Sequence, residues 1–124
     1  SMGILNTTQT TKSRGDAAED QALAYLQQQG LRLLQRNYRT PGRGGGEIDL
    51  IMREQQTVVF VEVRQRSSAQ FGGAAASVTA VKQARLWRTA EYYLQRYARA
   101  PSCRFDLIAI QGAELSWIRH IITH

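Results

Sequence analysis

The strongest constraint on how this chain can fold comes from two short apolar stretches that carry acidic residues. Residues 46–52 read Gly-Glu-Ile-Asp-Leu-Ile-Met, and residues 57–64 read Thr-Val-Val-Phe-Val-Glu-Val-Arg, with a few polar residues between them. Two β-rich runs at this spacing predict a hairpin. Because side chains alternate along a strand, three apolar residues are expected on the face opposite to the acids of the first run: Ile48, Leu50 and Met52.

The register of this hairpin depends on where its turn falls. If the turn is the four polar residues 53–56, Glu47 lies opposite Glu62, with Asp49 one diagonal step away. Like charges in these positions destabilise a sheet, and a divalent cation would offset their repulsion. Arg64 alone can neutralise only one carboxylate. The alternative is an ordinary exposed strand face whose acids pair with some of the many arginines.

Length and composition favour one domain in the cytoplasm. The chain has 124 residues and no apolar run near the roughly 18 residues that cross a bilayer. Residues 1–13 are polar and are expected to form a disordered tail, in which Ser1 before Met2 is typical of a cloning remnant. Residues 14–124 are left as a single domain. Cys103 is the only cysteine, so no disulfide can form within the chain.

The charge of the chain favours a polyanionic partner. Its net charge is +6 and its pI is about 10.1. Two of the 16 cationic residues are lysines, which leaves 14 arginines, the side chain best suited to forked contacts with phosphate. A GC-rich genome would also favour arginine codons. An acidic protein therefore stays an alternative partner to nucleic acid.

A helix, a strand and a glycine-rich loop are predicted before the hairpin. Asp16 can cap the helix, with Glu19 as its capping-box partner and Gly30 at its end. Capping is thus an alternative to any catalytic role for Glu19. Residues 31–38 predict the first strand. Residues 41–46 precede a strand, whereas phosphate-binding loops follow one, so they indicate a flexible connection or a mobile loop beside an active site.

A loop and a second helix are predicted after the hairpin. Residues 65–77 are polar and small, and this loop is able to close over a substrate. Thr79 is the expected cap of a helix that runs to about Ala98. Lys82 lies in the first turn, where the helix dipole disfavours a cation. We therefore expect Lys82 to face an anion.

The remaining pattern completes an α/β fold. Residues 104–110 predict a strand covered on both faces, and residues 115–122 predict one extra C-terminal strand. The order is then helix, three strands, helix and one or two strands, without repeats or linkers. This order predicts a mixed β-sheet flanked by helices.

Several of these stretches together resemble a known family. Residues 46–51 and 60–66 closely resemble the signature of the YraN-like family, small bacterial proteins of uncharacterised function. Further stretches agree with it in the same order: residues 14–19, 36–39, 81–83 and 104–106. That family is similar in turn to the restriction-endonuclease-like fold, which includes Holliday junction resolvases and has the active-site motif PD-(D/E)xK. The resemblance implies one nuclease-like domain over residues 14–124.

The resemblance also implies a metal-dependent nuclease that acts on DNA, with branched or single-stranded DNA as candidate substrates. Asp49 would be the first metal-binding acid, Glu62 the second, and Arg64 would occupy the lysine position. Mg²⁺ or Mn²⁺ held by carboxylates would neutralise charge on the phosphate and activate a water. The carbonyl of Val63 would join the two acids as a ligand. The remaining ligands would come, directly or through water, from one of two acids: Glu19 or Glu47.

Arg64 departs from this motif. Arginine keeps its proton at any working pH, so it can position a phosphate but cannot act as a general base. Either a carboxylate or Lys82 helps to activate the water, or the protein is a non-catalytic nucleic-acid-binding or adaptor protein. The candidates for contact with nucleic acid, DNA rather than RNA, are Arg36, Arg39, Arg43, Arg66, Lys82 and Arg85. Junction resolvases act as dimers, so a homodimer is a further expectation, without a surface assigned to it.

Overall fold

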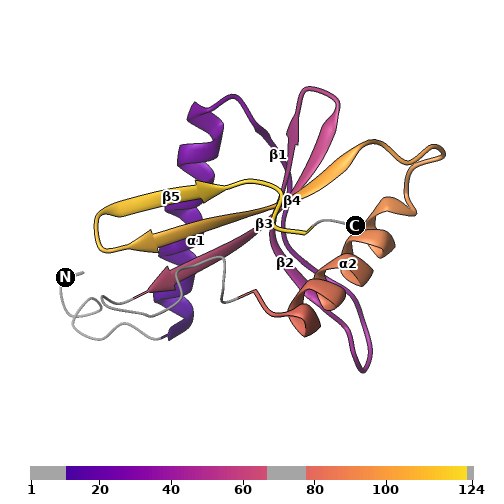
Figure 1. The fold of residues 1–124 in the computed structure, drawn as a ribbon, viewed down its shortest axis with the longest axis horizontal. Helices are drawn as coiled ribbons and strands as arrows, with labels where there is room; N and C mark the ends of the chain where they lie inside the picture. Colours follow the sequence, from indigo (N-terminus) through magenta and orange to yellow (C-terminus); the bar gives the residue numbers. More distant parts are fainter. Residues whose placement is uncertain (1–10, 67–77, 123–124) are drawn as a thin grey trace, which may run out of the picture.

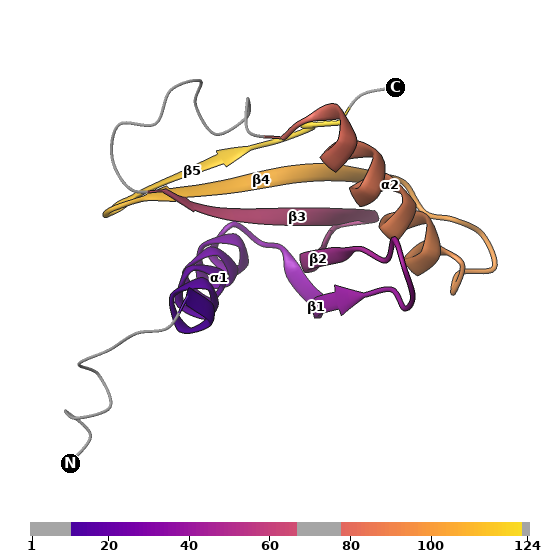
Figure 2. The same cartoon turned by 90° about the horizontal axis from the view of Figure 1, so that it is seen from below.

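The computed structural model describes residues 11–66 and 78–122, with side chains from Asp16 onward. It is a five-stranded sheet with one helix on each face (Figures 1 and 2). The elements in chain order are α1 (Thr11–Gln28), β1 (Arg32–Arg39), β2 (Glu47–Glu54), β3 (Thr57–Arg66), α2 (Ala80–Leu94), β4 (Cys103–Gln111) and β5 (Glu114–Ile118). The predicted mixed α/β order, with its extra C-terminal strand, is confirmed.

Two predictions fall partly outside the described residues. Residues 1–10 of the predicted tail lie outside them, whereas residues 11–13 belong to α1. Most of the predicted 65–77 loop lies outside them too. Among the described residues, no helix is both long and apolar enough to cross a membrane. A location in the cytoplasm stays a prediction.

The strand order follows the chain, from β1 at one edge to β5 at the other. Neighbouring strands are antiparallel except for β3 and β4, which are parallel. Parallel neighbours need a crossover connection, and α2 lies in the chain between them. Helix α2 is therefore part of the crossover that joins these two parallel strands.

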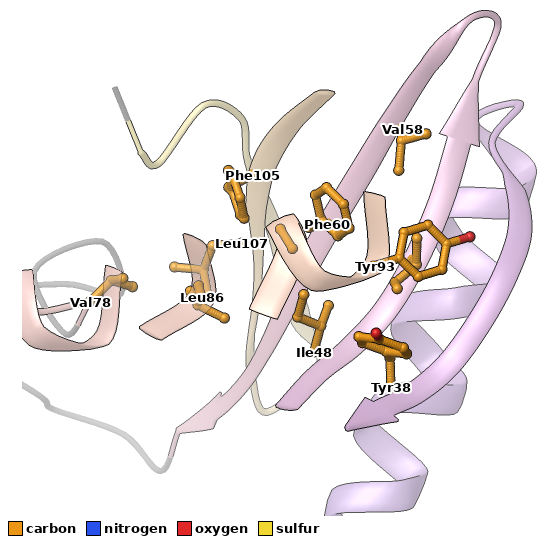
Figure 3. Close-up of a cluster of buried hydrophobic side chains, with 11 residues drawn as sticks. Tyr38, Ile48, Val58, Phe60, Val78, Leu86, Tyr93, Phe105 and Leu107 are labelled. Atoms are coloured by element: carbon orange, nitrogen blue, oxygen red, sulfur yellow. The ribbon is translucent and has the colours of Figure 1, made fainter. Parts of the chain in front are cut away.

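Each helix closes a separate hydrophobic layer against the sheet. On the α1 face, three helix residues pack with sheet residues that include Leu50 and Val61: Ala18, Ala22 and Leu26. On the α2 face, three others pack with sheet residues that include Ile48 and Phe60 (Figure 3): Leu86, Ala90 and Tyr93.

The helix boundaries differ from the predictions in two places. Helix α1 already begins at Thr11, so the prediction that Asp16 caps it is wrong. A capping signature is a local signal, and nothing in the residues before it prevents the helix from starting earlier. Thr79 caps α2 as predicted, because its side chain accepts a hydrogen bond from the Lys82 backbone N–H at 3.2 Å.

Helix α2 ends at Leu94, four residues before the predicted end at Ala98. The Arg96 backbone N–H and the Arg96 Nε both donate to the Tyr93 carbonyl, at 3.3 and 3.1 Å, whereas a continuing helix would have bonded this carbonyl to the N–H four residues later. The side chain thus satisfies a carbonyl at the helix end, and the chain turns away from the helix axis.

The hairpin register differs from the prediction by two residues. Glu54 pairs with Thr57, so the turn is Gln55 and Gln56 rather than four residues. Gln55 has a φ of 54°, which suits the tight turns that join twisted antiparallel strands. Extending this register beyond the pair of Leu50 and Val61 sets Asp49, not Glu47, opposite Glu62.

The alternation of β2 is interrupted at Asp49. Ile48 packs in the α2-side layer, whereas Leu50 and Met52 pack in the α1-side layer, so the predicted common face is wrong for Ile48. Across from this point, Asn37 of β1 has a φ of 56° inside the strand. Both strands therefore rotate at the position where the acid lies, and a period-two pattern does not reveal such a bend.

Candidate active site

The bend of β2 brings Asp49 beside Glu62 and Val63 of β3. The Val63 backbone N–H donates to Asp49 Oδ2 at 2.8 Å, and the register places Glu62 across from Asp49. Glu19 of α1 lies close enough for its charge to raise the pKa of Asp49. Three acids from three elements, distant in sequence, therefore meet at one place.

Asp49 is short of positive charge. Burial, and after it the nearby charge of Glu62, raises the pKa of Asp49 from 3.8 to about 7, against the opposing effect of the Val63 hydrogen bond. The structure shows no ion pair between Asp49 and any cation in the described part of the chain. At neutral pH this carboxyl is thus partly protonated, as expected for an acid that lacks a counterion.

Glu62 is neutralised from two sides. Its Oε2 lies 2.8 Å from Lys82 Nζ and 3.4 Å from Arg64 Nε. The Glu62 side chain is only 9% exposed, so these contacts compensate for a charge that is largely removed from water. The prediction that Lys82 faces an anion is confirmed, and the anion is Glu62.

Glu19 lies on the inner side of α1. Burial raises its pKa, although Arg36 opposes this effect with its Nε 3.5 Å from Glu19 Oε1. Oε1 is buried and accepts no hydrogen bond of good geometry from the described residues. Arg36 also reaches Asp20 at 2.6 Å and the Asp16 carbonyl at 3.2 Å. This predicted nucleic-acid contact is thus turned toward α1 and ties β1 to that helix.

The donor set fits a divalent cation in type. Carboxylate oxygens are the ligands that Mg²⁺ and Mn²⁺ prefer. A metal ion would relieve the shortage of cations at Asp49 and would give a partner to Glu19 Oε1, which accepts no hydrogen bond from the described residues. Within the described ranges, however, no three His, Cys, Asp or Glu side chains are grouped closely enough to hold an ion by themselves. Water or substrate oxygens would have to complete the coordination.

The other predicted site residues lie around this core. Glu47 is not opposite Glu62. It pairs with Arg39 at 3.6 Å, and both line a neighbouring pocket together with Lys82 and Arg85. Arg43 is exposed in the loop between β1 and β2. The last predicted contact, Arg66, is half-buried at the end of β3.

Sequence reasoning missed a second buried acid. Asp106 is fully buried, and Arg104 Nε donates to both of its oxygens at 3.1 Å. Trp117 Nε1 and the His120 backbone N–H donate to it at 2.9 and 3.1 Å. Arg104 also binds Glu54 at 2.7 Å. The only sequence signal is that positions 104 and 106 share a strand face, which indicates an ion pair but not its burial.

The fold and the site define a small mixed α/β protein with paired acids on neighbouring central strands and a basic helix beside them. Comparison with known families shows that the chain belongs to the uncharacterised protein family UPF0102, which matches residues 18–110. The predicted membership of an uncharacterised bacterial family is confirmed.

Close relatives carry the name of the same family. A UPF0102 protein of Polaromonas naphthalenivorans is 64% identical over 105 residues, which cover 84% of this chain and 69% of the relative. A UPF0102 protein of Albidiferax ferrireducens is 59% identical over 111 residues, or 89% of this chain and 87% of the relative. The similarity therefore includes both acidic strands and both helices.

Proposed function

We propose that the protein is a Mg²⁺- or Mn²⁺-dependent nuclease that acts on DNA. One observation carries the proposal: Asp49 and Glu62 lie on neighbouring strands, and the burial of Asp49 and the charge of Glu62 raise the pKa of Asp49 to about 7. An acid held in this state suits a site that gains a cation during function. The resemblance to the restriction-endonuclease-like fold supports the same reaction.

Asp49 and Glu62 would hold the metal ion, with Glu19 as a further ligand directly or through water. When bound, the ion would supply charge neutralisation at the phosphate and a more acidic water. Val63 orients Asp49 through its backbone N–H, so the carboxyl keeps one oxygen free of that bond. This leaves the chain itself to position the substrate.

Lys82 and Arg64 would contact the phosphate group. Both cations already lie within 3.4 Å of Glu62, so a phosphate beside Glu62 meets two donors without a large movement. Arg64 stays charged at any working pH and serves only as a donor. Lys82 comes from α2 rather than from β3, and it supplies a lysine near the second acid, where this chain has Arg64 in place of the lysine of the motif.

The test compares cleavage by the parent protein with cleavage by Asp49→Asn and Glu62→Gln variants. Branched, single-stranded and duplex DNA are offered with Mg²⁺ or Mn²⁺. Both variants should lose metal-dependent cleavage, because each loses a charged ligand while keeping its shape. Glu91→Gln, an exposed acid on α2, is the control and should cleave like the parent. Equal cleavage by all four proteins would contradict the proposal.

A non-catalytic DNA-binding or adaptor protein is the second candidate function. It is favoured by the two cations that already neutralise Glu62, because they compete with a metal ion for that carboxylate. In this case DNA binding should depend on salt and not on metal, and no cation should give products. Binding that strengthens on addition of Mg²⁺ would contradict this second function.

A further inference from the structure

A pocket beside the acidic site is the strongest feature that the proposed reaction leaves unused. Its volume is about 370 Å³, and it opens between the loop that joins β1 to β2 and the first turns of α2. The loop and the helix lie side by side in both views (Figures 1 and 2). Four charged side chains line the pocket, together with Thr40, three glycines and Leu86: Arg39, Glu47, Lys82 and Arg85.

The glycines of the loop fix the wall of this pocket. A Cβ atom on Gly46 would collide with the Thr89 hydroxyl and lie 3.2 Å from Arg85 Cγ, so only glycine allows this approach to α2. The Gly46 N–H donates to Thr40 Oγ1 at 2.7 Å, and the Thr40 N–H donates to the Gly46 carbonyl at 3.0 Å. The loop is thus closed on itself and packed on the helix, which is more order than a flexible connection requires.

The charge of the pocket is positive. Three cations face one carboxylate, and that carboxylate, Glu47, is paired with Arg39. Lys82 is paired with Glu62, whereas Arg85 is exposed and forms no ion pair with the part of the chain that the structure describes. Among the described residues that line the pocket there is no aromatic side chain on which a base could stack. The lining therefore suits a phosphate group rather than a base.

We propose that this pocket binds a backbone phosphate of the same DNA strand whose neighbouring phosphate lies at Asp49, with Arg85 as its main contact. The inference rests on the proposed function and adds how the strand is held. Lys82 belongs to both sites, since it lines the pocket and pairs with Glu62. Glu47 of the pocket precedes Asp49 by two residues, about 6.7 Å along a strand. A DNA strand with one phosphate in the pocket can therefore place its next phosphate at Asp49 and Glu62.

The experiment measures binding of a short, fluorescently labelled oligothymidylate in EDTA, so that cleavage plays no part. Arg85→Ala should weaken binding about 5- to 10-fold and reduce the slope of log affinity against log salt by about 1. Arg88→Ala is the matched control, because Arg88 is exposed on the same helix but does not line the pocket. Its loss should be less than about twofold. Equal losses in the two variants would overturn the inference.

A second variant tests the pocket in the opposite direction. Glu47→Gln removes the one carboxylate of the lining, so binding of the same probe should become about 2- to 3-fold tighter. Unchanged or weaker binding would contradict a phosphate in this pocket. The binding results can be told apart from the cleavage results. If Arg85→Ala binds the probe more weakly but the parent cleaves no DNA, the phosphate pocket stands and the nuclease activity is contradicted. If the parent cleaves DNA but Arg85→Ala and Arg88→Ala lose equal affinity, the nuclease activity stands and the phosphate pocket is contradicted.

Discussion

Two aspartates of one sheet, the half-buried Asp49 on β2 and the fully buried Asp106 on β4, differ sharply in what surrounds them. Asp106 has no exposed surface and receives donors from Arg104, Trp117 and the His120 backbone. Each of its oxygens is thus hydrogen-bonded, and a cation neutralises its charge. This is how a buried acid becomes part of a stable core.

Asp49 receives one backbone hydrogen bond and lies near other acids instead. Burial and the charge of Glu62 raise its pKa to about 7. The same residue type is therefore neutralised by a cation at one place and has no cation beside it, among the described residues, at the other. The Asp106 network therefore satisfies a buried charge within the fold, whereas Asp49 keeps a carboxyl whose ionisation costs stability, as is typical of functional sites.

The largest expected effect concerns the satisfied acid. Asp106→Asn leaves Arg104 without its carboxylate and turns an amide N–H₂ toward existing donors. The free energy of unfolding should fall by about 3–5 kcal/mol, as expected when one partner of a buried ion pair is lost. Urea denaturation measures it, with Glu91→Gln as a control that should stay within about 0.5 kcal/mol of the parent. A variant as stable as the parent would show that the hydrogen bonds to Asp106 do not stabilise the fold.

The opposite sign is expected for Asp49, the acid without a neighbouring cation. Asp49 ionises near 3.8 in the unfolded chain and at about 7 in the folded protein, so its charge costs stability that grows between these two pKa values as the pH rises. Asp49→Asn removes this cost and still accepts the Val63 N–H. At about pH 8 the free energy of unfolding should rise by about 2–4 kcal/mol, and near pH 4 the gain should nearly vanish. A loss of stability at the higher pH would show that Asp49 has a counterion.

A smaller loss is expected at the tryptophan that serves Asp106. Trp117→Phe removes the donor at 2.9 Å but keeps a ring near Tyr25, whose centroid lies 6.1 Å from that of Trp117. The free energy of unfolding should fall by about 1.5–3 kcal/mol, the usual value of a hydrogen bond to a charged group. Denaturation curves should show no dependence of this loss on pH between about 6 and 9. A loss below about 0.5 kcal/mol would mean that Arg104 alone satisfies the acid.

The smallest effect concerns Glu19. Its charge contributes to the raised pKa of Asp49, after burial and Glu62. Glu19→Gln should therefore lower the pKa of Asp49 from about 7, as followed by carboxyl carbon shifts in an NMR titration. Asp20→Asn is the control, because Asp20 is exposed on the same helix and pairs with Arg36. Equal shifts in the two variants would place Glu19 outside the site.

The sequence predicted much of this arrangement because its signals were local. The hairpin, the cap at Thr79 and the anion facing Lys82 all follow from spacing or from the helix dipole, and the structure confirms them. The register was wrong by two residues because Arg53 and Glu54 continue the ladder, and Glu54 is drawn to Arg104 at 2.7 Å. The sequence of the hairpin alone cannot predict that Glu54 pairs with an arginine 50 positions away.

The rest of the site depends on the tertiary structure. The rotation of β2 at Asp49 accompanies the left-handed Asn37 on a different strand, which alternation in one strand cannot express. The sequence suggested a capping role for Glu19 because its spacing from Asp16 fits a capping box. Helix α1 begins earlier, at Thr11, so Glu19 has no capping role. The hydrogen bonds to Asp106 come from Arg104 on the same strand and from residues that follow in the chain, up to His120. The pairing of β4 with β5 brings these donors to Asp106, and the sequence does not show this pairing.

The most direct test of the central claim is the pKa of Asp49 itself, measured by NMR with and without Mg²⁺. Without metal the carboxyl should titrate at about 7. Because a bound cation favours the charged form, addition of Mg²⁺ should lower this pKa markedly. A pKa for Asp49 near 4 that Mg²⁺ leaves unchanged would contradict the account.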